Sequence, residues 1–229
     1  MGRFFSYLLV ATLALGAGYY LSILTIPASR PSFVATTTPQ VAVVPFTTME
    51  MKEVTATHSI DVKYPKFGIV TIDPKIEKVV NEIVKEFKTL TANPPDMASP
   101  LLELTLDFDT PYIGPDIVSV EIVHTEYTGG AHPNSLSHGL NFDKATGRQL
   151  VLDDALRMIG LTLKQVSVAA TAQLEERLGD VFFPDGADSN SGNFSSFLIS
   201  ADTVTFIFQP YQVAPYVAGP QTISFERKK

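Results

Sequence analysis

Residues 4–26, FFSYLLVATLALGAGYYLSILTI, contain no charged residue, and no other stretch of the chain restricts the fold so strongly. A helix of this length spans roughly 35 Å, which exceeds the apolar thickness of a bilayer. Arg3 precedes the run, and this charge favours an orientation with the rest of the chain outside the cytoplasm. We therefore predict a signal-anchor transmembrane helix over residues 1–26. A signal peptide cleaved near residues 14–17 is the alternative, and it places the remainder on the same side.

The composition excludes several classes of function. The 229-residue chain has a net charge of -7 and no long basic stripe, so nucleic-acid binding is disfavoured, because phosphate contacts need clustered lysine and arginine. The absence of cysteine excludes disulfides, thiol catalysis and thiolate metal sites. We expect partners other than nucleic acid.

The chain divides into three parts. Residues 27–49 follow the apolar run, are rich in Pro, Thr and Ala, and have the composition of an extended tether. We expect these residues to be a linker that holds a domain away from the membrane. Residues 50–229 then form an extracytoplasmic domain.

Hydrophobic periodicity predicts the elements of this domain. The first helix begins near Asp73, a capping residue, with Pro74 in its first turn, and residues 93–95 (Asn-Pro-Pro) end it. A second helix covers residues 161–178 and stops at Gly179. Strands are predicted at residues 53–65, 101–109, 117–127, 137–143, 148–152, 194–200, 203–208 and 222–225. This order predicts an α+β fold: a largely antiparallel sheet packed by two main helices, preceded by the N-terminal transmembrane helix.

The stretch YTGGAHPN, residues 127–134, follows the alternating strand 117–127. Gly129 and Gly130 allow positive φ, so the stretch is predicted to be a strand-to-strand turn. A second interpretation is a zinc site, because His124, His132 and His138 lie within fifteen positions. Their spacing matches no known template, and we expect neither a metal nor a cofactor. A general base at His132 is a third interpretation, although the chain has no nucleophile elbow around a serine.

Two further stretches are unusual. Residues 185–193, DGADSNSGN, are rich in calcium-type oxygen ligands but fail the EF-hand pattern, which favours a solvated loop. Residues 208–220, FQPYQVAPYVAGP, contain three prolines that forbid a continued strand. Tyr211 and Tyr216 therefore lie in an ordered loop. They either pack back on the core or face a partner, for which tyrosine is a favoured residue.

Three of these motifs occur together in one family. The segments EYTGGAHPN, NFDKATGRQLVLDD and FLISADTVTFIFQPYQVAPYVAGP resemble the extracytoplasmic domain of RsiV-type anti-sigma factors. The same domain precedes the catalytic domain of PdaC-type peptidoglycan deacetylases. The family is defined as a domain of unknown function. Only residues 1–3 precede the predicted span, and no separate catalytic domain follows, so we expect neither the sigma-factor binding nor the deacetylase activity of those relatives.

The resemblance implies a membrane-anchored binding or sensing module without catalytic activity. Its expected partner is a cell-envelope glycan, such as peptidoglycan, or a secreted protein such as a lysozyme. The candidate binding residues are Tyr127, Gly129, Gly130, His132, Tyr211 and Tyr216. The alternative is a cell-wall hydrolase that uses His132 with nearby carboxylates.

Overall fold

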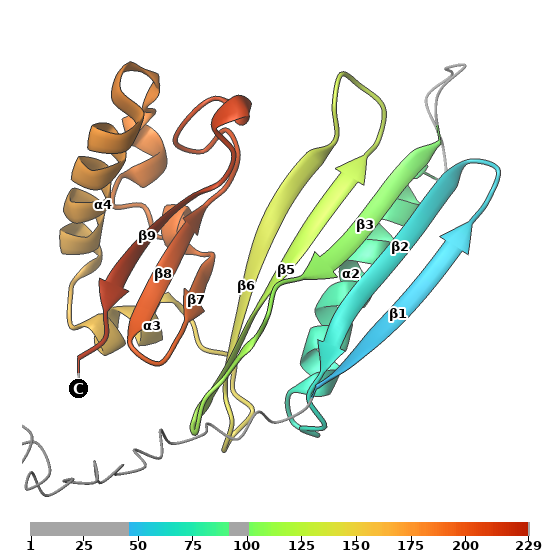
Figure 1. The fold of residues 1–229 in the computed structure, drawn as a ribbon, viewed down its shortest axis with the longest axis horizontal. Helices are drawn as coiled ribbons and strands as arrows, with labels where there is room; N and C mark the ends of the chain where they lie inside the picture. Colours follow the sequence, from blue (N-terminus) through green and yellow to red (C-terminus); the bar gives the residue numbers. More distant parts are fainter. Residues whose placement is uncertain (1–45, 92–100, 229) are drawn as a thin grey trace, which may run out of the picture. The chain divides into compact units, whose positions relative to one another are not determined.

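A computed structural model of the chain describes residues 46–91 and 101–228, which lie within one compact unit (Figure 1). The predicted transmembrane run lies outside the described residues. Within the described part, no helix combines the length and the apolar character that a membrane crossing requires. The first strand begins at Thr47, so the folded domain starts slightly before the expected boundary at residue 50.

The first sheet is built from the N-terminal half of the domain. Its strand order is β1-β2-β3-β5-β4, with β6 also paired to β5. All of its pairs are antiparallel except β2 with β3, and helix α2 provides the crossover that a parallel pair requires. The elements are β1 (Thr47–Val54), β2 (His58–Lys66), α2 (Asp73–Thr91), β3 (Leu102–Phe108), β4 (Tyr112–Ile113), β5 (Ile117–Tyr127) and β6 (Asn134–Asp143).

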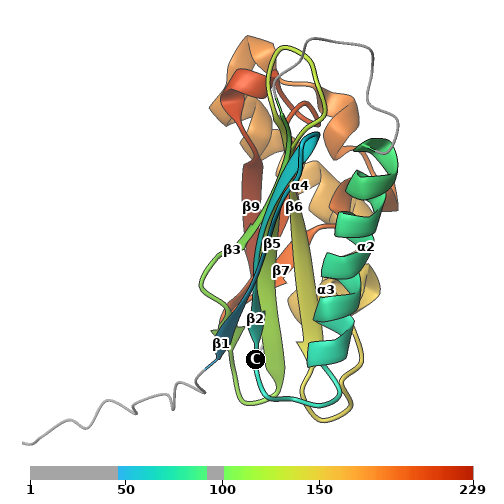
Figure 2. The same ribbon diagram turned by 90° about the vertical axis from the view of Figure 1, so that its right-hand side faces the viewer.

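Helix α2 covers one face of this sheet (Figure 2). Its buried residues recur at helical spacing, and they include Ile76, Val80, Ile83, Val84 and Phe87. These side chains pack on every second residue of the strands to form the first hydrophobic core. The opposite face of the sheet carries exposed polar residues on β3. Helix α2 therefore covers one face of the sheet, and the other face is open over β3.

The second sheet is smaller and antiparallel, with the order β7-β8-β9. Helices α3 and α4 and the edge-on rings of Phe194, Phe206 and Phe208 contribute to the second core. Helix α4 begins with a capping box between Thr162 and Gln165. The elements are α3 (Leu152–Ile159), α4 (Leu163–Leu178), η1 (Gly179–Val181), η2 (Pro184–Ala187), η3 (Ser191–Phe194), β7 (Phe197–Ile199), β8 (Thr203–Phe208), η4 (Tyr216–Ala218) and β9 (Gln221–Glu226).

Side chains rather than a strand pair join the two sheets. The Asn141 amide, fully buried, donates to the Phe197 carbonyl at 2.7 Å and accepts from the Ile199 amide at 3.1 Å. The Ser119 hydroxyl accepts from the same Ile199 amide at 3.0 Å. Gly139 lets β6 approach β7, because a Cβ on it would lie 2.0 Å from the Phe197 carbonyl oxygen. Strand β7 is therefore held at a fixed place over β5 and β6.

The α+β prediction is confirmed, but some of its details differ from the structure. The segment 53–65 is not one strand, because the Thr55 hydroxyl accepts the backbone N–H groups of Thr57 and His58 and turns the chain between β1 and β2. The described residues form two sheets rather than one, and the pairing is largely antiparallel as predicted, with β2 and β3 as the parallel pair.

The predicted strand 148–152 was also wrong. Only Gln149 forms a β-bridge, with Phe142, and a third helix, α3, begins at Leu152. The buried carboxylate of Asp154 accepts from the Val151 amide and pairs with Arg148 and Arg157. These interactions fix the first turn of a helix where the alternation alone suggested a strand.

Candidate functional site

The turn between β5 and β6 is the first part of the candidate site. Glu126 pairs with Asn134, and the chain reverses between them. Gly129 and Gly130 have φ of 93° and 136°, so the predicted glycine turn is confirmed. A Cβ on either glycine would meet no atom within 4 Å, so backbone conformation and not crowding requires glycine here. The Tyr127 hydroxyl donates to the Gly130 carbonyl at 3.1 Å and braces the turn.

The fold brings His132 together with the two tyrosines of the C-terminal loop. The His132 ring stacks on Tyr216 with centroids 4.1 Å apart and lies 6.4 Å from Tyr211. The two tyrosine rings are 5.3 Å apart. The Tyr216 hydroxyl donates to the Pro133 carbonyl at 2.9 Å, and His132 Nε2 lies 3.3 Å from the Tyr211 hydroxyl. We call these three side chains the aromatic platform.

The platform lies at one end of the domain. Figures 1 and 2 show the β5–β6 turn and the loop with η4 at the same end, although they are far apart in the sequence. His132 is exposed, Tyr211 is 55% exposed and Tyr216 is half-buried. The rings therefore present part of their surface to solvent instead of filling the core.

Tyr211 has a strained backbone. Its φ of 68° makes it the one non-glycine residue with positive φ in the described ranges. Such a conformation costs about 1–3 kcal/mol and persists only where the surroundings impose it. Here the side chains of Gln209 and Gln212, which flank Tyr211 in the sequence, hold this segment in place.

These two glutamines clamp the loop to the rest of the domain. The side-chain amide of Gln209 accepts a hydrogen bond from the Ser137 N–H and donates one to the Ser137 carbonyl, each at 2.8 Å. A residue of a paired neighbouring strand would form the same two bonds. The Gln212 amide donates to the carbonyls of Gly186 and Asn193, both at 2.9 Å. The loop that carries Tyr211 and Tyr216 is therefore preorganised.

The three histidines of the zinc interpretation do not come together. His124 and His138 stack with centroids 5.8 Å apart on β5 and β6, whereas His132 stands in the turn on the platform. In residues 46–91 and 101–228, no group of three or more His, Cys, Asp or Glu side chains has the geometry to hold a metal ion. Burial is the main cause that lowers the pKa of His138, and the neighbouring His124 lowers it further.

The structure does not assemble a hydrolytic site around His132 either. Its Nδ1 lies 2.7 Å from the Pro133 carbonyl, and its Nε2 faces Tyr211. Within the part of the chain that the structure describes, no carboxylate shares a hydrogen bond or ion pair with this ring. The alternative in which His132 acts with nearby carboxylates therefore has no geometric support.

The polar loop 185–193 is internally bonded. Asn193 Nδ2 donates to Asp188 Oδ1 at 2.7 Å and to the Asp185 carbonyl at 2.9 Å, and Gly186 lies against the Gln212 carbonyl oxygen. The side chains of Asp188 and Asn193 thus bond within the loop, and Gln212 of the C-terminal loop bonds to its backbone. This loop is a structural brace of the platform.

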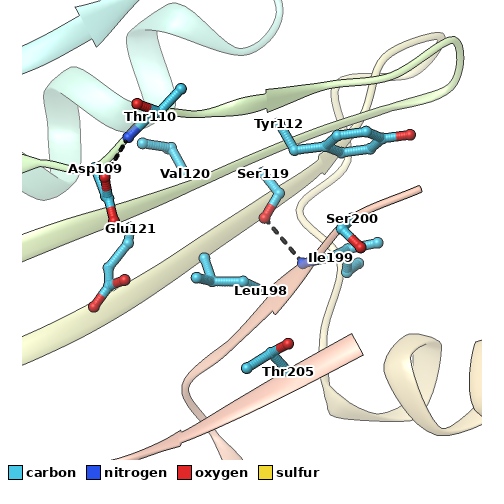
Figure 3. Close-up of a pocket in the computed structure, with 10 residues that line it drawn as sticks. All are labelled: Asp109, Thr110, Tyr112, Ser119, Val120, Glu121, Leu198, Ile199, Ser200 and Thr205. Carbon is cyan, nitrogen blue, oxygen red and sulfur yellow. Dashed lines mark hydrogen bonds between the residues drawn. The ribbon is translucent and has the colours of Figure 1, made fainter. Parts of the chain in front are cut away.

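A cleft of about 230 Å³ was not predicted from the sequence (Figure 3). It is lined by residues of the 109–112 segment and β5 on one side and of β7 and β8 on the other. No local pattern indicates it, because its two walls come from different sheets.

Comparisons with known proteins agree with these segments. Residues 51–135 match the family model "Deacetylase PdaC", and residues 160–228 match "Protein of unknown function (DUF3298)". The chain is therefore similar to both families, each over a part of its length. The resemblance to PdaC-type proteins that the motifs indicated is thereby confirmed. Residues 136–159 lie between the two matches and contain most of β6 and helix α3.

One curated relative is the peptidoglycan-N-acetylmuramic acid deacetylase PdaC of Bacillus subtilis strain 168, 24% identical over 176 residues. The match covers 75% of this chain but only 38% of that protein, so the chain spans well under half of its relative's length.

Solved structures of the DUF3298 family share the fold. A member from Bacteroides fragilis NCTC 9343 superposes with a TM-score of 0.52 at 20% identity, over 81% of this chain and 91% of its own. A member from Pseudomonas aeruginosa PAO1 gives 0.51 at 15% identity, over 81% and 94%. At these identities the similarity establishes the fold alone.

Proposed function

We propose that residues 46–228 form an extracytoplasmic, non-catalytic module that binds a component of the cell envelope through the aromatic platform. The ligand is a glycan such as peptidoglycan or a secreted protein such as a lysozyme. The domain is held to the membrane by the apolar run 4–26. The relationship to PdaC supports the cell-envelope setting, and the uncharged run supports the anchor.

This proposal rests on the exposure and the backbone conformation of Tyr211. An exposed aromatic residue with positive φ contributes little to the core, and its conformation costs stability. Four hydrogen bonds from two glutamines nonetheless fix the loop on which it stands. Rigid aromatic side chains bind partners with a small loss of conformational entropy, which is the advantage of such an arrangement.

The test separates stability from binding by replacing Tyr211 with glycine. The change relieves the backbone strain and removes the ring, so we expect the melting temperature to stay level or rise. Binding to purified cell wall or to lysozyme should weaken about tenfold, as for a tyrosine hot spot. Phe183→Ala removes a 41% exposed aromatic ring outside the platform and should leave binding unchanged. Retention of full binding by Tyr211→Gly would refute the assignment of the platform.

A further inference from the structure

The cleft between the two sheets is a second candidate binding site. One wall carries Asp109, Thr110 and Glu121, and the other carries Leu198, Ser200 and Thr205 (Figure 3). None of these residues belongs to the aromatic platform. Ligand pockets are usually about 300–1,000 Å³, so a cleft of about 230 Å³ suits a ligand smaller than a drug-sized molecule.

The base of the cleft is rigid. Figure 3 shows the bond from the Ile199 amide to the Ser119 hydroxyl, and the same hydroxyl donates to Asn141 Oδ1 at 2.7 Å. Ser119 and Asn141 are both buried. These bonds fix the separation of the walls, so the cleft exists before a ligand arrives and its occupation costs little reorganisation.

The charged groups of the cleft, Asp109 and Glu121, are both hydrogen-bond acceptors. Asp109 Oδ1 accepts from the Thr110 amide at 2.8 Å, which leaves its second oxygen available. The Glu121 side chain is half-buried, and Figure 3 shows its carboxylate with no hydrogen bond to another residue drawn. Across the cleft, the Thr205 hydroxyl is tied to Ser224 at 2.8 Å. Among the described lining residues there is no lysine, arginine or histidine, so an anionic ligand would be repelled.

The apolar surface of the cleft comes from both walls. Leu198 is half-buried and projects between the two sheets. The Tyr112 ring lies at the end of the cleft where Ser200 lies, on the right in Figure 3. The lining thus combines carboxylate acceptors and hydroxyl groups with apolar surface. A polyhydroxylated ring presents the matching combination, since its hydroxyl groups donate and its C–H faces are apolar.

We propose that this cleft binds a single sugar ring, with Asp109 and Glu121 accepting hydrogen bonds from its hydroxyl groups and Leu198 contacting its apolar face. Hydrogen bonds to charged acceptors are stronger than those to neutral ones, so the carboxylates provide most of the selectivity. The ring is either a free monosaccharide or the end residue of a glycan chain, because both present the same hydroxyl groups. The site is independent of the platform, and either assignment can fail without the other.

The test uses the full chain and ligand-observed NMR titrations with glucose, N-acetylglucosamine and an oligomer of N-acetylglucosamine. The open-chain polyol sorbitol is the chemical control. We expect at least one of the three sugars to bind with a millimolar dissociation constant and sorbitol not to compete. Binding of a free monosaccharide assigns the site to single sugars, whereas binding of the oligomer alone assigns it to chain ends. Absence of binding by all three would overturn the proposal, as would equal competition by sorbitol.

A pair of matched variants locates the binding. Glu121→Gln keeps the shape of the side chain but removes its charge, and it should raise the dissociation constant about tenfold. Glu103→Gln makes the same change at an exposed position of β3 outside the cleft and should have no effect. Tyr211→Gly should also leave this binding intact. Equal losses in Glu121→Gln and Glu103→Gln, or no loss in Glu121→Gln while its thermal melt is unchanged, would refute the site.

Discussion

Replacing Gln209 with leucine tests how the C-terminal loop is held against β6. The wild-type amide makes two hydrogen bonds to Ser137, a residue that is only 7% exposed. Leucine has a similar volume but neither accepts nor donates. The Ser137 carbonyl would keep its bond from the Ser196 hydroxyl at 2.8 Å, whereas the Ser137 N–H would lose its partner.

The expected loss of stability follows from this difference: the Ser137 carbonyl keeps a partner, whereas the Ser137 N–H does not. An orphaned buried N–H costs about 1–3 kcal/mol, and the second bond contributes about 0.5–1.5 kcal/mol. We therefore expect the free energy of unfolding to fall by about 2–4 kcal/mol. A domain of this size loses about 2–4 °C of melting temperature per kcal/mol, which makes the loss easy to measure.

Urea denaturation measures the free energy, and hydrogen exchange reports on the Ser137 amide itself. The amide should exchange faster in Gln209→Leu than in the wild type, because it loses its acceptor. Gln173→Leu makes the same change on the exposed side of α4 and should stay within about 0.5 kcal/mol of the wild type. A stability loss no larger than that of the control, with Ser137 still protected, would refute the clamp.

Three other outcomes are expected. Gly139→Ala should destabilise by about 1–3 kcal/mol or more in a denaturant titration, since its Cβ would lie 2.0 Å from the Phe197 carbonyl; an unchanged midpoint would contradict the close approach of the sheets. The folded-state pKa of His138 is lowered from 6.5, so the unfolded state binds more protons at acid pH, and stability should fall as pH drops below 6.5. His138→Gln should flatten this part of the pH profile, and an identical profile would show that another group is responsible. Protease added to intact spheroplasts should remove the domain if residues 4–26 anchor it, and full protection would exclude the predicted orientation.

Local patterns in the sequence determined the features that depend on a few neighbouring residues. The helix with Pro74 in its first turn and the glycine turn at residues 129–130 follow from the fixed φ of proline and from backbone sterics. The alternation over residues 117–127 predicted β5 with its bounds, because side chains on a strand point to opposite faces. Such signals do not depend on the rest of the fold.

Where local patterns were ambiguous, nearby hydrogen bonds decided the outcome. The alternation across residues 53–65 continues through Thr55, whose hydroxyl nevertheless turns the chain into a hairpin. The apolar pattern of residues 148–152 suits a strand or a helix start, and the ion pairs of Asp154 select the helix. These side-chain bonds are not visible in hydrophobic periodicity.

Only the tertiary structure decided how the candidate site is assembled. The sequence singled out His132 in one loop and Tyr211 and Tyr216 in another, but their stacking requires that the second sheet dock beside β6. Asn141, Ser119 and Gly139 fix that docking through buried hydrogen bonds and a close backbone approach between residues about sixty to eighty positions apart. The cleft has the same origin, because its volume depends on the distance between the two sheets, and no local pattern encodes that distance.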